Sequence, residues 1–239
     1  MTLHRGRPDP VGVDAEHRVH EEKKDISRMS AGSSELRVAA YVLAGGGSTR
    51  FGRDKALVEF AGKPMLARMI ELMRSFAGDV RIVSALNKYA DFEPGIVEDR
   101  WPGEGPLGGI VTALLQTRET QPKREWNLIV SCDMPFLTAE WLRFLVERAT
   151  KSAAQVMVPH SAHGPEPLCA CWRTDAVETL RAAFEGGVRR VNQGISLLRA
   201  EVLDARDWKR FDSAGRLFWN MNTAADYEEA RRIVEAEQI

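Results

Sequence analysis

The sequence is poor in cysteine. Its 239 residues include three cysteines, Cys132, Cys169 and Cys171, an odd number in which no two have the C-x-x-C spacing. Disulfide frameworks need paired cysteines and zinc ribbons need C-x-x-C pairs, so neither is indicated. A reducing cytoplasm is therefore the expected location.

Histidine is also scarce. Three of the five histidines lie before residue 21, which leaves His160 and His163 in the rest of the chain. A metal centre built mainly from imidazole ligands needs more histidines than this. We therefore do not expect a histidine-based metal site.

Long apolar runs and an excess of one charge are missing as well. No apolar run approaches the roughly 20 residues that cross a bilayer, and the N-terminus lacks the apolar segment of a signal peptide. The formal net charge is −1, so no overall positive field attracts nucleic acids or anionic lipids. We therefore expect neither a nucleic acid nor a membrane as a partner.

The first 35 residues differ in composition from the rest. They are polar and charged, and they contain no periodic apolar pattern that could offset the cost of ordering them. We predict a disordered tail over residues 1–35. The chain is 44% hydrophobic and 28% charged, which is enough for one sizeable core, so residues 36–239 are expected to form a single domain.

Short apolar runs alternate with amphipathic segments from residue 38 onward. Residues 38–44 form a continuous apolar run that ends at three glycines, which is typical of a strand buried on both faces. Further strands are predicted at 80–84 and 128–130, and helices at 64–77, 106–118 and 138–150. The alternation predicts a three-layer, Rossmann-like α/β fold with a mostly parallel sheet and right-handed crossovers.

The pattern continues less regularly in the last third of the chain. Strand-like segments occupy residues 155–159, 167–172 and 202–203, and a helix is expected near 175–185. The sequence Thr223-Ala224-Ala225-Asp226 has the form of a capping box. It therefore predicts the start of a last helix.

A glycine-rich segment with cations follows the first strand. It reads Leu43-Ala44-Gly45-Gly46-Gly47-Ser48-Thr49-Arg50-Phe51-Gly52-Arg53-Asp54-Lys55. Amides that no β-carbon covers can approach a phosphate chain, and Arg50 and Lys55 can neutralise its charge. The segment is not the Rossmann fingerprint, because Arg50 stands where the last glycine belongs, nor a Walker loop, because Arg53-Asp54 replaces Lys-Ser/Thr. A plain tight turn is the alternative, but the order of strand, glycines, arginine and lysine favours a phosphate site.

Asp133 comes shortly after the apolar run at 128–130. It should lie past the carboxyl end of an inner strand, where open α/β sheets bind their ligands. Mg²⁺ commonly takes one or two carboxylates together with waters and phosphate oxygens, so this carboxylate suffices as a protein ligand. The alternative is that Asp133 only caps the turn into the helix at 138–150. Neighbouring Cys132 is interpreted as a small buried apolar residue, because no histidine is placed to activate it as a nucleophile.

The glycine-rich segment and later motifs together resemble the molybdenum cofactor guanylyltransferases. The pattern L-A-G-G-x-x-x-R-x-G-x-D-K over residues 43–55 is similar to the signature of this family, and Gly62-Lys63-Pro64-Met65-Leu66 continues it. Later motifs agree in order, namely Glu98-Asp99, Gly105-Pro106-Leu107-Gly108-Gly109, Cys132-Asp133-Met134-Pro135-Phe136-Leu137, Glu166-Pro167-Leu168 and Asn220-Met221-Asn222-Thr223. The resemblance runs from about residue 40 to 235 and implies the nucleotidyltransferase form of the three-layer fold.

The resemblance also implies roles for individual residues. In the N-terminal half it implies nucleotide contacts by Leu43, Ala44, Gly45, Gly46, Lys55, Asn87, Asp99 and Asp133. In the C-terminal half it implies acceptor contacts by Pro167, Asn220 and Asn222. Arg50, Lys55 and Asp133 would carry catalysis, with Asp133 as the ligand of Mg²⁺.

Simpler structural roles remain open for the acceptor residues. Pro167 can set a turn, and nearby Trp172 can fill the core. Asn220 and Asn222 can serve turn and capping chemistry ahead of the last helix. The sequence motifs alone therefore allow both interpretations.

The implied reaction is the transfer of GMP from GTP to the terminal phosphate of molybdopterin or its molybdenum form, with release of pyrophosphate. Partners would be GTP, the acceptor cofactor and the maturation proteins of molybdoenzymes. Ala44-Gly45-Gly46 favours GTP, because the cytidylyl branch of the family tends towards Ala-Ala-Gly. The alternatives are a CTP-dependent cytidylyltransferase, a sugar-phosphate nucleotidyltransferase and a nucleotide-binding regulator without turnover. The motifs of the second half argue against the sugar enzyme, and the joint presence of two cations and a carboxylate argues against the regulator.

The tail prediction can be tested by truncation. Deleting residues 1–35 should change the melting temperature and the steady-state rate by little, because the tail offers no core-forming pattern. Melting curves and rates of the full and shortened chains measure this. A large loss of either quantity would show that the tail is part of the fold or of the site.

Overall fold

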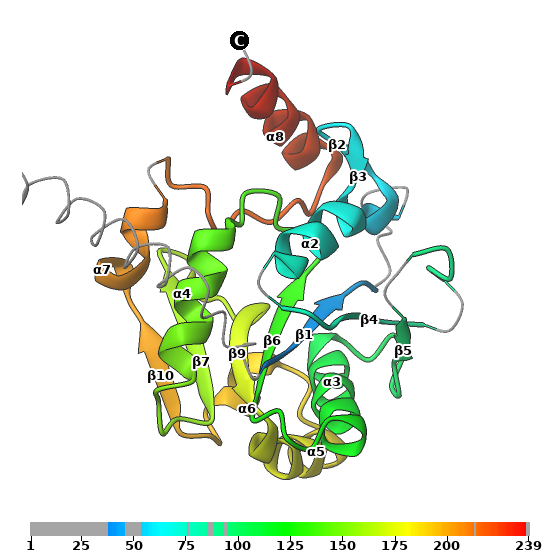
Figure 1. Ribbon diagram of the computed structural model, residues 1–239, viewed down its shortest axis with the longest axis vertical. Helices are drawn as coiled ribbons and strands as arrows, with labels where there is room; N and C mark the ends of the chain where they lie inside the picture. The colour runs from blue at the N-terminus through cyan, green and yellow to red at the C-terminus, as the bar shows by residue number, and fades with distance from the viewer. Residues whose placement is uncertain are drawn as a thin grey trace, which may run out of the picture. The chain divides into compact units, whose positions relative to one another are not determined.

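A computed structural model gives the fold of the chain (Figure 1). The structure describes residues 38–45, 54–75, 77–85, 88–92, 95–212 and 214–237. The predicted tail lies outside these residues and stays a prediction. In the described part of the chain, no helix is long and apolar enough to cross a membrane.

Among the described residues, an eight-stranded sheet forms the centre of the fold. The strands follow the spatial order β10 (Ala200–Leu203), β7 (Val156–Ser161), β9 (Cys169–Arg173), β6 (Trp126–Ser131), β1 (Val38–Leu43), β4 (Val80–Ser84) and β5 (Ile96–Glu98), and the short β8 (Gly164–Pro165) pairs with β7. β9 is antiparallel to both of its neighbours, whereas β10 with β7 and the series β6, β1, β4, β5 pair in parallel. The predicted mostly parallel sheet is therefore confirmed.

Helices and short elements connect the strands. In chain order they are the 3₁₀ helix η1 (Lys55–Leu57), the hairpin strands β2 (Glu59–Phe60) and β3 (Lys63–Pro64), α2 (Met65–Arg74), α3 (Pro106–Thr120), α4 (Ala139–Ala149), η2 (Thr174–Ala176), α5 (Val177–Glu185), α6 (Val191–Ile195), α7 (Ala205–Trp208), η3 (Lys209–Phe211) and α8 (Ala224–Glu237). With the strands they give the predicted alternation.

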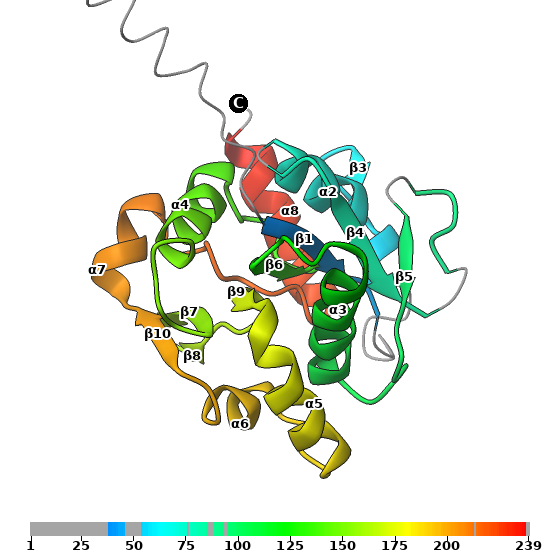
Figure 2. The same cartoon turned by 60° about the horizontal axis from the view of Figure 1, so that its bottom comes forward.

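The central strand β1 shows why helices cover both faces of the sheet. All of its residues are apolar, and successive side chains of a strand point to opposite faces. Val38, Ala40 and Val42 join one core cluster with residues of α2 and α4. Ala39 and Tyr41 join a second cluster with residues of α3 and α5. Figure 2 shows these two pairs of helices on opposite sides of the sheet, which confirms the three layers.

The sequence pattern locates the longer elements closely. The strand predicted at 80–84 is β4, and the helix predicted at 138–150 is α4, one residue shorter at each end. The helix predicted at 106–118 is α3, which continues to Thr120. The helix predicted at 64–77 is α2, which ends at Arg74. The segment 128–130 is the middle of the longer strand β6.

The shortest elements do not follow from the sequence pattern. β5 has three residues, and β2 and β3 have two each, so no periodicity can be recognised within them. The strand predicted at 167–172 begins at Cys169 instead. The reason is a turn in which the Cys169 N–H donates to the Glu166 carbonyl over 3.1 Å.

The last helix begins with the predicted capping box. Thr223 Oγ1 accepts a hydrogen bond from the Asp226 N–H (3.2 Å), and Asp226 Oδ2 accepts one from the Thr223 N–H (2.7 Å). The reciprocal pair satisfies amides that the first turn of a helix leaves without partners. α8 therefore starts at Ala224, as the motif indicates.

α8 is attached to the hairpin formed by β2 and β3, beside which it lies in Figure 1. Ala230 of α8 and Met221 ahead of it are buried in one cluster with Phe60 and Met65. The Tyr227 hydroxyl donates to the Glu59 carbonyl over 2.7 Å. The C-terminal segment is thus held beside the start of α2.

Strand direction decides where a site can form. β6, β1, β4 and β5 run parallel, so their carboxyl ends meet at one edge of the sheet. Leu43, Ser84, Glu98 and Ser131 are the last residues of these strands. The loops that follow them come together there, which is where open α/β sheets bind ligands.

A buried chain of polar side chains links β1, α3 and β6. The Tyr41 hydroxyl lies 2.7 Å from Thr117 Oγ1, which donates to Asn127 Oδ1. The Asn127 amide donates to the Trp172 carbonyl (3.1 Å) and to Thr174 Oγ1 (3.0 Å). Asn127 therefore forms more hydrogen bonds within this network than any other member.

This network predicts unequal effects of two substitutions. Asn127→Ala should lower the free energy of unfolding by roughly 2–4 kcal/mol, because it leaves buried partners unsatisfied and opens a small cavity. Tyr41→Phe should cost about 1 kcal/mol, because Thr117 keeps its bond to Asn127. Urea unfolding curves measure both losses. Equal losses would contradict the central role of Asn127.

Candidate functional site

A cavity of about 490 Å³ opens at the carboxyl edge of the parallel strands. Its lining consists of Leu43, Ala44, Gly45, Val83, Ser84, Ala85, Lys88, Asp99, Pro102, Gly103, Gly105, Pro106, Gly109, Ser131, Asp133 and Leu168. This lining includes five of the residues predicted to contact a nucleotide, namely Leu43, Ala44, Gly45, Asp99 and Asp133. The fold thus brings residues from four strand ends to one space.

The end of β1 forms part of the cavity wall. The Leu43 carbonyl accepts a hydrogen bond from the Cys132 N–H (3.3 Å), and the Ala44 N–H donates to the Val83 carbonyl (3.0 Å). A β-carbon on Gly45 would meet no atom of the described residues within 4 Å, so packing against them does not require glycine there. Gly46 and Arg50, together with Asn87, lie outside the described residues, and their roles stay predictions.

Lys55 occupies the first position of η1, and its side chain is mostly buried, with 16% exposed. Its Nζ atom lies 3.5 Å from Asp133 Oδ2 and donates to Asn222 Oδ1 over 3.0 Å. Asp133 lies just after β6, and Asn222 lies in the segment before α8. The structure therefore brings the predicted lysine, carboxylate and one acceptor asparagine together.

Asp54 has a structural role beside Lys55. Its Oδ1 accepts a hydrogen bond from the Ala56 N–H (3.0 Å), which caps η1. The Tyr89 hydroxyl donates to its Oδ2 (2.9 Å), and Lys88 Nζ lies 3.0 Å from the same oxygen. Burial, with the neighbouring Asp54, raises the pKa of Tyr89 well above its usual range, so the hydroxyl stays a donor. Asp54 thus ties η1 to the segment after β4.

Asp133 lies past the end of β6, as predicted. Its Oδ1 accepts a hydrogen bond from Ser131 Oγ (2.6 Å), and its carbonyl accepts one from the Met221 N–H (2.9 Å). Thr138, whose Oγ1 accepts from the Trp141 N–H over 3.2 Å, caps α4 instead. The alternative in which Asp133 only caps the turn into this helix is therefore wrong.

The donor set at Asp133 fits a hard divalent cation with few protein ligands. In the described part of the chain, no group of three or more histidine, cysteine, aspartate or glutamate side chains is arranged to hold a metal. Mg²⁺ does not need such a group, because it keeps several waters and uses phosphate oxygens of its substrate. The Asp133 carboxylate, oriented by Ser131, meets this requirement.

Cys132 does not have the environment of a catalytic thiol. Its side chain is buried, with 7% exposed. Burial, followed by the charges of Asp133 and Asp54, raises the pKa of the thiol far above its usual range. The interpretation of Cys132 as a small buried residue agrees with this environment.

Asp99 begins the loop between β5 and α3. Its Oδ1 accepts hydrogen bonds from the Trp101 N–H and from Thr112 Oγ1, both over 3.1 Å. The loop continues through Gly103 and Gly105, whose φ angles are +82° and +96°. These angles are costly for other residues, so the glycines let the backbone turn along the cavity wall.

This wall is held by contacts between distant residues, which the sequence did not indicate. Arg189 forms an ion pair with Glu104 (2.7 Å), and its guanidinium lies 4.1 Å from the centre of the Phe184 ring. Trp101 packs on the same ring, with centroids 5.1 Å apart. Lys88, which lines the cavity, was missed as well. The sequence signal for these residues was a charged residue close to a glycine. The neighbouring residues in the sequence do not indicate which distant residue each one contacts.

The predicted acceptor residues differ in their partners and surroundings. Asn222 contacts Lys55, whereas the Asn220 side-chain amide donates to the Phe218 carbonyl over 3.1 Å. Pro167 lies in the turn ahead of β9 and does not line the cavity, although its neighbour Leu168 does. Trp172 is fully buried in the core, in agreement with the simpler of its two interpretations.

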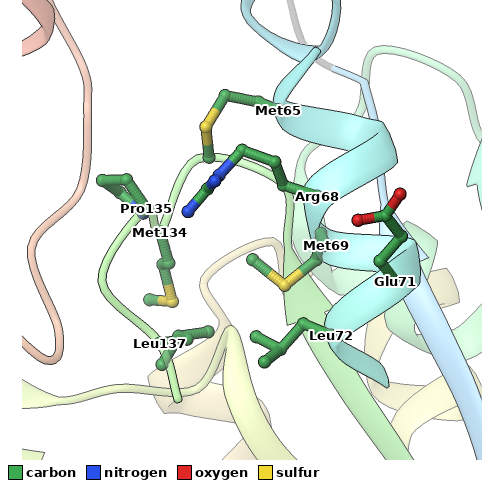
Figure 3. Close-up of a pocket in the computed structure, with 8 residues that line it drawn as sticks. All are labelled: Met65, Arg68, Met69, Glu71, Leu72, Met134, Pro135 and Leu137. Atoms are coloured by element: carbon green, nitrogen blue, oxygen red, sulfur yellow. The ribbon is translucent and has the colours of Figure 1, made fainter. Parts of the chain in front are cut away.

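A second cavity, of about 310 Å³, lies between α2 and the loop after Asp133. It is lined by Met65, Arg68, Met69, Glu71, Leu72, Met134, Pro135 and Leu137. Figure 3 shows Arg68 reaching from α2 towards Pro135, while Glu71 points away. None of the predicted site residues lines this cavity.

The sequence matches a protein family over most of its length. Residues 40–201 match the family described as MobA-like NTP transferase domain. A protein of Chloroflexus aggregans named "probable molybdenum cofactor guanylyltransferase" is 28% identical over 198 residues, which are 80% of this chain and 92% of that protein. A molybdenum cofactor guanylyltransferase of Shewanella sediminis is 27% identical over 205 residues, which are 84% and 97% of the two chains.

A solved structure is similar as well. It is the molybdopterin-guanine dinucleotide biosynthesis protein A of Archaeoglobus fulgidus, with a TM-score of 0.72 and 25% sequence identity. The match covers 83% of this chain and 99% of that one. The similarity therefore extends over nearly the whole of the other protein.

Proposed function

Because the chain belongs to the MobA-like NTP transferase family, we propose that it transfers GMP from GTP to the terminal phosphate of molybdopterin or its molybdenum form. Family membership makes the chain a nucleotidyltransferase, and the names of its relatives support the choice of substrates. The observation that carries the proposal is the contact of Lys55 with Asp133 over 3.5 Å beside the cavity at the strand ends.

The proposed reaction is an in-line displacement. An oxygen of the acceptor phosphate attacks the α-phosphorus of GTP and forms a new P–O bond. The bond from the α-phosphorus to the pyrophosphate breaks, and the pyrophosphate leaves with the electron pair. Such a reaction needs positioning and neutralisation of negative charge rather than a covalent intermediate on a side chain. The high pKa of the Cys132 thiol is consistent with this chemistry.

Each charged residue has a separate task in this proposal. Lys55 binds the triphosphate as a compact cation, and Arg50 adds a second positive charge. Asp133 holds Mg²⁺, with Ser131 orienting its carboxylate. When bound, the metal would neutralise the charge on phosphate oxygens. Asp99 contributes to nucleotide binding from the cavity wall.

The remaining contacts divide between the two substrates. Leu43, Ala44, Gly45 and Gly46 contact the nucleotide, with the amides of the two glycines directed to its phosphates, and Asn87 contacts the nucleotide as well. Pro167, Asn220 and Asn222 contact the acceptor. The sequence Ala44-Gly45-Gly46 supports GTP over CTP, because it matches the guanylyl form of the motif.

We also propose that the protein acts in the cytoplasm. All three cysteines are free and buried, as suits a reducing compartment. The product would pass to the maturation proteins of molybdoenzymes.

Product analysis tests the proposed function directly. Purified protein is incubated with Mg²⁺, each of GTP, CTP and ATP, and either molybdopterin or a sugar phosphate as acceptor, and the products are separated and identified by mass. We expect the guanine dinucleotide and pyrophosphate. Preferential use of CTP would assign the cytidylyl reaction, turnover of a sugar phosphate would assign the second alternative, and binding without turnover would assign a regulator.

Asp133→Asn should lower the transfer rate by at least about a hundredfold, because an amide cannot supply the anionic ligand that Mg²⁺ requires. The fold should persist, since Asn can still accept from Ser131. Asp175→Asn, on η2 after β9, is the matched control and should keep the wild-type rate. Near-normal turnover of Asp133→Asn at saturating Mg²⁺ would rule out the metal role.

Lys55 and its neighbour Asp54 should respond differently to substitution. Lys55→Ala should weaken GTP binding roughly tenfold or more, because it removes a charged hydrogen-bond donor, and Lys55→Arg should restore binding only in part. Asp54→Ala should lower the melting temperature without nucleotide by about 2–4 °C, because η1 loses its cap.

Melting curves with and without GTP and Mg²⁺ separate these two effects, because a ligand stabilises in proportion to its affinity for the native state. Lys55→Ala should lose most of the GTP-induced shift and keep its melting temperature in the absence of GTP. Equal GTP-induced shifts in the wild type and in Lys55→Ala would exclude the phosphate role.

A further inference from the structure

Lys55 stands between two acceptors of different strength. Its Nζ atom lies 3.0 Å from the neutral Asn222 Oδ1 and 3.5 Å from the charged Asp133 Oδ2. Unhindered ammonium–carboxylate contacts close to about 2.7–2.9 Å. The contact with Asp133 is therefore loose, and the tighter bond is the one to Asn222.

Asn222 is held by an aspartate that lies one helical turn further along the chain. Asp226 Oδ2 accepts hydrogen bonds from the backbone N–H groups of both Asn222 (2.8 Å) and Thr223 (2.7 Å). The second of these belongs to the capping box, whereas the first lies outside it. Asp226 thus fixes the backbone of the residue whose side chain binds Lys55.

The segments on either side of Asn222 are anchored as well. Met221 is buried, and its N–H donates to the Asp133 carbonyl over 2.9 Å. On the other side, α8 is held by buried Ala230 and by the Tyr227 hydroxyl on the Glu59 carbonyl. Asn222 itself is exposed, so its position depends on these backbone contacts rather than on packing of its side chain.

The charge of Asp226 suits this role at neutral pH. Partial burial raises the pKa of Asp226, but the hydrogen bonds from the Thr223 and Asn222 amides outweigh it and leave the pKa below its usual value. The carboxylate is therefore ionised and accepts from both amides.

We propose that Asp226 is a positioning residue for Lys55, acting through Asn222 to keep the ammonium group from closing on Asp133 and so leaving that carboxylate free for a divalent cation. This inference rests on the proposed metal-dependent nucleotidyl transfer. A lysine freed from Asn222 would form a tight pair with Asp133, and the cation would then have to displace it. Lys55 uses only the Oδ1 atom of Asn222. The Nδ2 group, which accepts no hydrogen bond and donates to none of the described residues, can still contact an acceptor.

The test measures the Mg²⁺ concentration that half-saturates GTP binding. Binding is detected through the GTP-dependent thermal shift of the full chain. Asp226→Ala should raise the half-saturating Mg²⁺ concentration about three- to tenfold, because a hydrogen bond to a charged group is lost. Asn222→Ala removes the Oδ1 acceptor with the cap intact and should give a similar rise. Asp226→Asn, which keeps one oxygen acceptor, should give a smaller one.

Asp204→Ala is the matched control. Asp204 caps α7 with its own capping box, so this variant loses the same kind of helix cap without any contact to Lys55. Its Mg²⁺ requirement should equal that of the wild type. In a Lys55→Met background, titrated at a GTP concentration raised to offset its weaker GTP binding, the Asp226→Ala substitution should no longer change the Mg²⁺ requirement, because the competing ammonium group is gone.

An equal shift in Asp204→Ala, or a shift that persists in Lys55→Met, would overturn the positioning role and indicate a general effect of helix capping. If the wild type binds CTP in preference to GTP, the choice of nucleotide fails, while the same titration with CTP still decides the role of Asp226. Absence of any Mg²⁺-dependent nucleotide binding by the wild type would overturn both proposals.

Discussion

The site depends on the meeting of one cation and one carboxylate, Lys55 and Asp133. Both side chains are mostly withdrawn from water, with 16% and 17% exposed. The two charged groups lie 3.5 Å apart, and each has a closer neutral partner, Asn222 for Lys55 and Ser131 for Asp133. The other contacts at this edge, from Asp54, Ser131 and the segment before α8, orient one or the other member of this pair.

The sheet makes this meeting possible. Because β1 and β6 run parallel and side by side, the glycine-rich segment and Asp133 leave the sheet at the same edge. Asp54 then ties η1 to Tyr89 after β4, and the Met221 N–H ties the C-terminal segment to the Asp133 carbonyl. Three distant parts of the chain are therefore fixed around one pair of charges, and the cavity beside them is the space that the strand ends leave open.

Much of the fold could be predicted from local patterns. The apolar run of β1 and the helical spacing of α3 and α4 place these elements to within one or two residues, because each is long enough to show its period. β5 and the hairpin of β2 and β3 are too short for this. The position of Asp133 could be predicted, because this residue follows a buried strand. Whether Asp133 caps α4 could not be predicted, and in the structure Thr138 is the cap.

By itself, the sequence determined the order of strands and helices, the glycine-rich segment with its lysine, and the capping box of α8, because each is written in neighbouring residues. Only the tertiary structure decided that Lys55 contacts Asn222, 167 positions away, and that Asp54 binds Tyr89 instead of Lys55. It also decided that Pro167 stays outside the cavity while Leu168 lines it. The physical reason is that such contacts depend on the pairing of strands and the packing of helices, which no local pattern of residues encodes.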